Sequence, residues 1–163
     1  MKLASACQTD VVIDTNVFSH ADNPAAPLAR DSLDVLMWLQ LADVLLVLDN
    51  TGKGNPAGPS TSLLATEYQN TLSPQGFALT LITSLLSTGR CKFVKRPAQA
   101  TAATIRSLVP NNSRDRAVLG AACGAQDGVL VSNDYQDFTI AVRTAASTSL
   151  AVAIVDSSQC DCT

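Results

Sequence analysis

Short, uninterrupted apolar runs alternate with helix-forming segments along this chain of 163 residues. The run Val44–Leu48 contains no polar residue, which is typical of a parallel strand covered on both faces. Parallel neighbours need a long crossover connection, and this is usually a helix. The alternation therefore predicts one α/β domain with three layers, in which helices cover a central parallel sheet of about four to five strands.

The pattern also predicts where the individual elements lie. Gly, Pro, Asn, Ser and Thr fill residues 49–61, so this segment is expected to be a loop. Ser113 is expected to cap a helix that begins at Arg114, and Gly124 is suited to end it. Strands are expected at 11–14, 44–48, 91–94, 129–133 and 150–155. Helices are expected at 31–42, 62–72, 74–87, 98–108, 114–123 and 135–146.

The composition is that of a folded domain: 47% of the residues are apolar and 15% are charged. The formal net charge of −3 argues against a protein that coats nucleic acid through a generally basic surface. It does not argue against a nuclease, because bound metal would neutralise several of the acidic side chains. A chain of this length fits a single domain.

The cysteines and the apolar segments indicate a compartment. No stretch of ~20 apolar residues is present, so no membrane span or membrane partner is expected. The five cysteines are irregularly spaced, as is typical of free thiols in a reducing environment. Cys160 and Cys162 lie close together, but no neighbouring Cys or His completes a zinc site. The protein is therefore expected to be cytoplasmic.

Four acidic residues stand out in a chain that is otherwise poor in charge: Asp14, Glu67, Asp115 and Asp134. Asp14 and Asp134 each end a predicted strand, and Asp115 and Glu67 lie near the starts of predicted helices. In right-handed strand–helix–strand units these positions meet at the carboxyl edge of the sheet. Clustered carboxylates repel one another unless a cation neutralises them. The pattern therefore predicts a divalent-metal site and phosphodiester chemistry.

Four segments that carry these acids resemble, in order, the motifs of PIN-domain ribonucleases. The resemblance extends over about positions 10–155, and the first and last motifs are the most specific. It implies a PIN-like nuclease domain at 10–155, an N-terminal tail at 1–9 and a C-terminal tail at 156–163. The segments are Val12–Phe18, Leu64–Tyr68, Arg114–Ala122 and Leu130–Phe138.

The resemblance implies a three-layer, Rossmann-like PIN fold. It also implies an endoribonuclease that depends on Mg²⁺ or Mn²⁺ and leaves a 5′-phosphate and a 3′-hydroxyl. Asp14, Glu67, Asp115 and Asp134 would be catalytic. Asp14, Asp115 and Asp134 would also hold the metal, together with Asp137 as an auxiliary acid. Polar residues next to the aspartates would hydrogen-bond and orient the carboxylates, and two arginines would bind the RNA substrate. These residues are Thr15, Asn16 and Asn133 for the first role, and Arg114 and Arg116 for the second.

The resemblance also implies a biological setting, the toxin of a toxin–antitoxin pair. A small antitoxin protein and a homodimer are then the expected partners. Alternatives remain open: a housekeeping RNA-processing nuclease, or a non-catalytic module that binds RNA or protein on the same fold. A haloacid-dehalogenase-type phosphatase fits less well, because it needs an Asp where this chain has Asn16. The basic run 90–96 is either a second phosphate-binding surface or a solvated charged segment.

Overall fold

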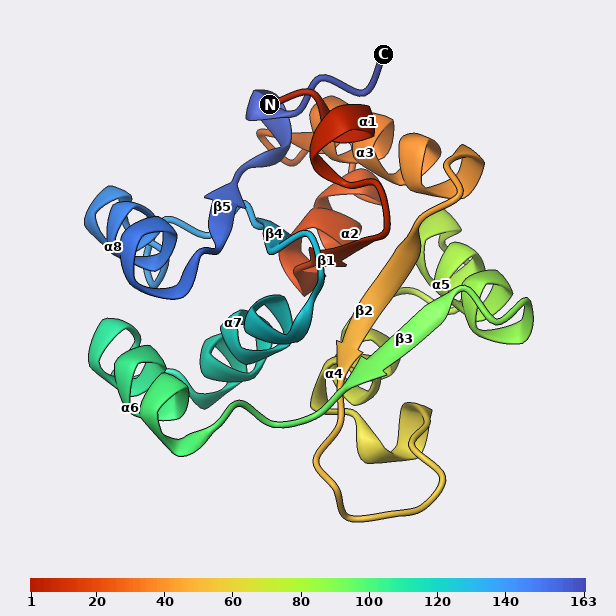
Figure 1. The fold of residues 1–163 in the computed structure, drawn as a ribbon. Coiled ribbons are helices and arrows are strands. Elements are labelled where there is room, and N and C mark those ends of the chain that lie inside the picture. The colour runs from red at the N-terminus through yellow and green to blue at the C-terminus, as the bar shows by residue number, and fades with distance from the viewer.

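The expected strands form a five-stranded, fully parallel sheet in the computed structural model, which describes residues 1–163 (Figure 1). The strand order is β3-β2-β1-β4-β5, and every neighbouring pair is parallel. The predicted α/β class and its parallel sheet are therefore confirmed. The strands are β1 (Asp10–Ile13), β2 (Leu45–Asp49), β3 (Cys91–Val94), β4 (Val129–Val131) and β5 (Ala153–Val155).

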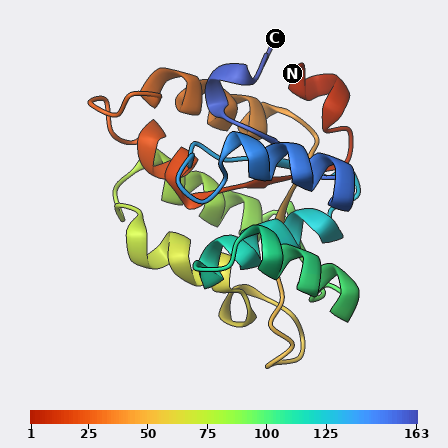
Figure 2. The same ribbon diagram turned by 90° about the vertical axis from the view of Figure 1, so that its left-hand side faces the viewer.

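Helices cover both faces of this sheet. Right-handed crossovers from β1 to β2 and from β2 to β3 place their helices on one face, and the reversed direction of β3 to β4 to β5 places the others on the opposite face. Figure 2 shows α6, α7 and α8 together on the side nearest the viewer. The helices are α1 (Leu3–Ala6), α2 (Thr15–Ala21), α3 (Ala29–Leu41), α4 (Leu63–Thr71), α5 (Phe77–Ser87), α6 (Gln99–Leu108), α7 (Ser113–Gly124) and α8 (Ile140–Leu150), with 3₁₀ turns η1 (Pro59–Thr61) and η2 (Ser157–Gln159).

The strand order reverses direction between β1 and β4. From β1 the chain moves outward to β2 and β3, and it then returns to β4 on the other side of β1. The two strands pair through Val12 with Leu130 and Ile13 with Val131. In open α/β sheets, ligands bind at the carboxyl ends of the strands at such a switch point. Asp14 and Ser132 directly follow the paired residues, so both lie at that position.

Several predicted boundaries were wrong. No helix was expected between the strand at 11–14 and the helix at 31–42, but this segment contains the seven-residue helix α2, which buries Val17 and Phe18. Helix α8 begins at Ile140 and not at 135, because Thr139 caps it by accepting a hydrogen bond from Val142 N. The last strand is shorter than predicted, since Ala151 has a left-handed φ of 55° and ends the preceding helix.

The two chain ends pack together at the top of Figure 1. Lys2 and Asp161 form a parallel β-bridge, in which Leu3 N donates to Asp161 O at 2.9 Å. Leu3 and Cys7 are both buried in the core. The residues on either side of the predicted domain are therefore part of the folded unit. None of the helices combines the length and apolar character that a membrane span requires.

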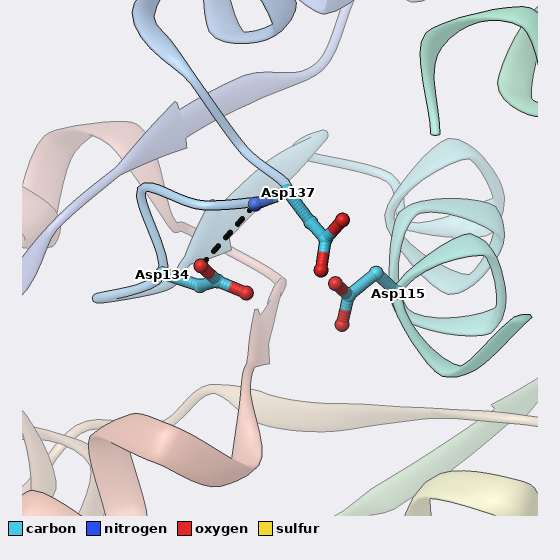
Figure 3. Close-up of side chains that lie close together, drawn as sticks. All are labelled: Asp115, Asp134 and Asp137. Carbon is cyan, nitrogen blue, oxygen red and sulfur yellow. Dashed lines mark hydrogen bonds between the residues drawn. The ribbon is translucent and has the colours of Figure 1, made fainter. Parts of the chain in front are cut away.

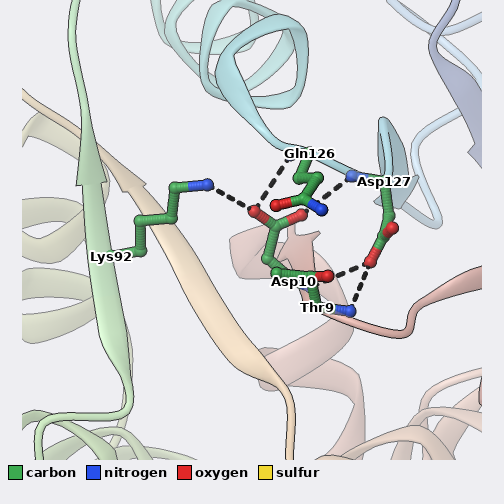
Figure 4. Close-up of polar contacts among 5 residues, drawn as sticks. All are labelled: Thr9, Asp10, Lys92, Gln126 and Asp127. Carbon is green, nitrogen blue, oxygen red and sulfur yellow. Dashed lines mark hydrogen bonds and ion pairs between the residues drawn. The ribbon is translucent and has the colours of Figure 1, made fainter.

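A second acidic group lies at the amino end of β1 and serves the fold (Figure 4). The buried Asp10 carboxylate accepts from Lys92 Nζ at 2.7 Å and from the backbone N–H groups of Gln126 and Asp127 at 3.0 Å. Asp127 in turn accepts from Thr9 N and Asp10 N. Burial alone would raise the pKa of Asp10, but these donors outweigh it and the pKa is lowered. Both oxygens of the Asp10 carboxylate are thus paired with donors, whereas the Oδ2 atom of Asp115 at the carboxyl edge is buried without a hydrogen bond.

Candidate active site

Three aspartates meet at the carboxyl edge of the sheet. Asp115 comes from the first turn of α7, and Asp134 and Asp137 come from the loop after β4 (Figure 3). Each offers a carboxylate oxygen, and these oxygens lie within 4.8 Å of one another. Asp115 is buried and the other two are half-buried. These three residues could bind a metal ion, because hard divalent cations prefer carboxylate oxygens.

The loop after β4 owes its shape to Asp134. The Oδ1 atom of Asp134 accepts from Gln136 N at 2.7 Å and from Asp137 N at 3.3 Å, which forms an Asx turn. This turn brings the Asp137 carboxylate back toward Asp115, as Figure 3 shows. The sequence predicted that a helix starts at 135 and includes Asp137. Instead, the Asp134 side chain hydrogen-bonds the backbone N–H groups of Gln136 and Asp137, and the helix starts only at Ile140.

Helix α7 is placed by Asn112, a residue that the sequence did not single out. Its Oδ1 atom accepts from Arg114 N at 3.1 Å and from Asp115 N at 3.2 Å, so Asn112 and not Ser113 is the N-cap. Its Nδ2 atom donates to Asp137 Oδ2 at 2.9 Å. One side chain therefore ties the start of α7 to the loop after β4. Adjacent Asn and Ser are both good caps, so the sequence alone did not distinguish them.

Asp14 lies beside this group, at the end of β1, and is 4% exposed. Its Oδ2 atom accepts from Ser132 Oγ at 2.6 Å and from Asn16 Nδ2 at 2.8 Å. Burial, together with the negative charges of Glu67 and Asp134, raises the pKa of Asp14 to about 6. Asn16 thus contacts the carboxylate that it was predicted to orient. Ser132 makes the shorter contact and was not predicted.

Asp115 carries the clearest sign of a missing partner. Its side chain is 8% exposed, and its Oδ2 atom is buried without any hydrogen bond. Burial, the adjacent Asp137 carboxylate and the charges of Asp14 and Asp134 together raise the pKa of Asp115 to about 8. A buried, unsatisfied carboxylate oxygen among other carboxylates is costly without a cation. The residues therefore fit a divalent metal such as Mg²⁺ or Mn²⁺.

Glu67 belongs to the neighbourhood but not to the group of three. It is half-buried on α4 and lines a cleft of about 300 Å³ between α4 and α7, together with Arg114. Its charge contributes to the raised pKa of Asp14 and of the buried Tyr68. The four predicted catalytic acids therefore share one edge, with Asp115 and Asp134 in contact range and Asp14 and Glu67 around them.

The other residues predicted to orient the carboxylates are placed differently. Thr15 Oγ1 is buried and has no hydrogen-bond partner. The Asn133 side chain faces away from the acids: it donates to Ser32 Oγ at 2.9 Å and accepts from Ser157 Oγ at 2.9 Å. Only its backbone N–H reaches toward the site, donating to Asn16 Oδ1 at 2.9 Å. Asn133 supports the loop from behind and does not contact the carboxylates through its amide.

The predicted substrate-binding arginines differ from each other. Arg114 is exposed and lines the cleft beside Glu67. Arg116 donates to the carbonyl oxygens of Val109 and Pro110, at 3.1 and 2.8 Å, so part of its guanidinium holds the end of α6. In the basic run, Arg90 donates to carbonyl groups at the end of α3, including Leu39 O at 2.8 Å. Arg90 and Lys92 are therefore structural.

Arg143 on α8 is a further residue that the sequence did not reveal. Its Nε atom donates to Phe138 O at 2.8 Å, and its Nη2 atom donates to Ser132 O at 3.0 Å and Asp134 O at 2.8 Å. Its guanidinium also lies 4.1 Å from the ring centroid of Tyr135. One cation thus fixes the loop that carries Asp134 and Asp137. Nothing in the spacing of Arg143 from the motif indicates these contacts.

Replacing Arg143 with Met should lower the affinity for Mn²⁺ about 10- to 100-fold, because residues that orient metal ligands have effects of this size. The three carbonyl groups would lose their donor, and the free energy of unfolding should fall by about 2–3 kcal/mol. Calorimetric titration of Mn²⁺ and thermal denaturation measure the two effects. Arg106→Met, at an exposed position on α6, is the matched control. Unchanged Mn²⁺ affinity in Arg143→Met would show that other contacts position the loop.

No protein-family model matches the chain, and no curated protein matches it. Among solved structures, the chain is similar to a chain in the crystal structure of VapBC2 from Rickettsia felis. That structure contains a DNA fragment from the VapBC2 promoter. The two chains are 14% identical with a TM-score of 0.48, and the match covers 90% of this chain and 98% of the other. A likeness of this degree assigns no role to any residue.

Proposed function

We propose that the protein is a metal-dependent endoribonuclease whose active site is the carboxyl edge of β1 and β4. The observation that carries this proposal is the group formed by Asp115, Asp134 and Asp137, with carboxylate oxygens within 4.8 Å and the Asp115 Oδ2 atom unsatisfied. Acids placed only for stability are paired with donors, as Asp10 is. The Oδ2 atom of Asp115 has no such donor, although it is buried beside other carboxylates, and a cation is the partner that its chemistry requires.

The three aspartates would hold Mg²⁺ or Mn²⁺, with Asp14 beside them. When bound, such an ion supplies Lewis-acid activation and stabilises the charge that develops on the phosphate oxygens. Asp14 is held rigidly by Ser132 and Asn16, so its charge has a fixed position. Glu67 lies in the open cleft, where its carboxylate can orient the water that attacks phosphorus. Arg114 lines the same cleft and binds a substrate phosphate.

The purified protein should cut single-stranded RNA internally when Mg²⁺ or Mn²⁺ is present and should be inactive in EDTA. The products should carry 5′-phosphate and 3′-hydroxyl ends. A generic phosphomonoester assayed in parallel separates this activity from that of a phosphatase on a similar sheet. Hydrolysis of the monoester without RNA cleavage would contradict the proposal, as would complete inactivity with both metals.

The toxin of a toxin–antitoxin pair is the biological role that we propose for this nuclease, with a small antitoxin and a second copy of the chain as partners. The resemblance of the four acidic motifs to those of PIN-domain ribonucleases supports this role. Expression in a bacterial host should arrest growth, and a small protein encoded beside the gene should relieve the arrest. Normal growth despite soluble, RNA-cleaving protein would favour the housekeeping alternative.

A further inference from the structure

Two hollows on the surface share their walls and form one groove. The first is the cleft between α4 and α7, which contains Glu67 and Arg114. The second is a pocket of about 100 Å³ between β3, the connection to α6, and α7. Leu63 and Ala117 line both hollows, so the two adjoin along α7. We call the two adjoining hollows together the α7 groove. From Arg114 to Ala121 it follows α7 for about 10 Å, at 1.5 Å per residue.

The far end of the α7 groove carries unpaired positive charge. Lys95, Arg96 and Arg116 line it. Lys95 and Arg96 are exposed and their side chains form no hydrogen bond, while the single ion pair of the protein joins Lys92 to Asp10. These two cations therefore have no structural task, in contrast to Arg90 and Arg143. Their position is informative because the chain as a whole has a net charge of −3.

The one acid that lines this end does not neutralise the cations. Asp49 Oδ1 accepts from Ser62 Oγ at 2.7 Å and from Leu64 N at 2.9 Å, and its Oδ2 atom accepts from Leu63 N at 3.0 Å. The Asp49 carboxylate thus accepts hydrogen bonds from the start of α4, where its negative charge is favourable next to the helix dipole. Between the two ends of the groove lies Leu63, which is 53% exposed and offers an apolar contact. The groove therefore runs from Glu67 and Arg114, past an apolar side chain, to free cations.

We propose that the α7 groove binds the sugar-phosphate backbone of single-stranded RNA on one side of the scissile bond, with Lys95 and Arg96 on the outer phosphates. This inference rests on the proposed function, because it takes the end of the groove that contains Glu67 as the side on which cleavage occurs. Free cations at the other end suit a chain that carries a phosphate at every residue.

The test is the salt dependence of RNA binding by the double variant Lys95→Gln/Arg96→Gln. Binding of a fluorescein-labelled single-stranded RNA is followed by anisotropy from about 50 to 200 mM NaCl in Mg²⁺, with Asp14→Asn in every protein to stop cleavage. Each phosphate contact on a single strand contributes about 0.7 to the slope of log K against log salt. The slope should therefore decrease by about 1.4, and the affinity at 0.1 M salt should fall about 10- to 30-fold.

The matched control is Lys2→Gln/Arg30→Gln, which removes the same charge from two exposed residues outside the groove. Its salt slope should equal that of the parent, and all proteins should melt at the same temperature. An equal slope for Lys95→Gln/Arg96→Gln and its parent would overturn the inference. So would tighter, groove-dependent binding of a polyglutamate peptide, which would assign the groove to an acidic protein partner.

These results separate the groove from the proposed function. If the wild-type protein cleaves RNA but the double variant keeps the parental slope, the groove assignment fails and the nuclease assignment stands. If the double variant loses slope as expected but the wild-type protein cleaves no RNA with either metal, the nuclease assignment fails and the groove remains an RNA-binding surface.

Discussion

Replacing Asp14 with Asn should reduce RNA cleavage about 10³-fold, which corresponds to about 4 kcal/mol of transition-state stabilisation. The amide oxygen can still accept from Ser132 Oγ and Asn16 Nδ2, so the local structure should persist while the charge is lost. Asp134→Asn should have a similar effect, because an Asn also supports the Asx turn to Gln136 and Asp137. Single-turnover cleavage of a labelled RNA in saturating Mg²⁺ measures both losses.

The matched control for these variants is Asp34→Asn, the same substitution at an exposed position on α3. Its cleavage rate should equal that of the wild-type protein. Circular dichroism and thermal denaturation verify that each variant is folded. Full metal-dependent activity in Asp14→Asn would remove Asp14 from the active site and leave the group on α7 and the β4 loop as a separate feature.

The second large effect concerns stability without metal. In EDTA the melting temperature should fall as the pH rises from about 5 to 8. The pKa values of Asp14 and Asp115 are raised to about 6 and about 8 in the folded chain, so the folded state binds more protons than the unfolded state in this range. Their contribution is present at low pH and is lost as each carboxylate ionises. The pKa values of Asp10 and Asp156 are lowered, so their contributions change only at more acidic pH.

Asp115→Asn should remove much of this pH dependence. At pH 8 without metal it should raise the free energy of unfolding by about 2 kcal/mol, allowing for solvent screening at the rim of the sheet. For a chain of this size that is about 4–8 °C in melting temperature. Excess Mn²⁺ should stabilise the wild-type protein by mass action, by about 2.7 kcal/mol at 100 times Kd, and should stabilise the variant much less.

Thermal scans of both proteins, at several pH values with EDTA or Mn²⁺, measure these effects. If Asp115→Asn melts well below the wild-type protein in EDTA and gains as much from Mn²⁺, Asp115 serves as a helix-start charge on α7 and not as a metal ligand. In Asp115→Asn we expect a higher melting temperature in EDTA together with a smaller increase on adding Mn²⁺. Such a trade-off is common where residues needed for activity destabilise the fold.

The sheet could be predicted because most of its strands contain a short uninterrupted apolar run. Runs such as Val44–Leu48 are buried on both faces, and this leaves a signal that needs no tertiary information. Helix α2 left no such signal, since seven residues are too few to show a 3.6-residue period. The start of α8 was placed five residues early because the capping oxygens of Asp134 and Thr139 act through local hydrogen bonds that the apolar pattern does not reflect.

The common edge of the four acids could also be predicted, because right-handed crossovers fix where strands end and helices begin. The adjacency of β1 and β4 could not, and it is this adjacency that brings Asp14 next to Ser132. Residues alternate in direction along an extended chain. Ser132 and Asp134 therefore face the site while the Asn133 amide faces Ser32 and Ser157.

Arg143 and Asn112 were missed for a different reason. Both act on backbone groups or side chains that only the folded chain brings within reach. Arg143 is one of several arginines in the sequence, and the carbonyl groups that it binds have no sequence signature. The acidic residues could be singled out in the sequence, whereas Asn112 and Arg143 became visible only through their contacts.

Calorimetric titration of Mn²⁺ at pH 7.5 into the wild-type protein, Asp115→Asn and Asp34→Asn tests most directly whether the carboxyl edge is a metal centre. The wild-type protein and Asp34→Asn should bind Mn²⁺ with the same affinity, and Asp115→Asn should bind it at least about 10-fold more weakly, because it loses the buried oxygen that lacks a partner. Equal affinity in all three proteins, or no saturable binding in any of them, would contradict the assignment of this edge as the site of metal-dependent RNA cleavage.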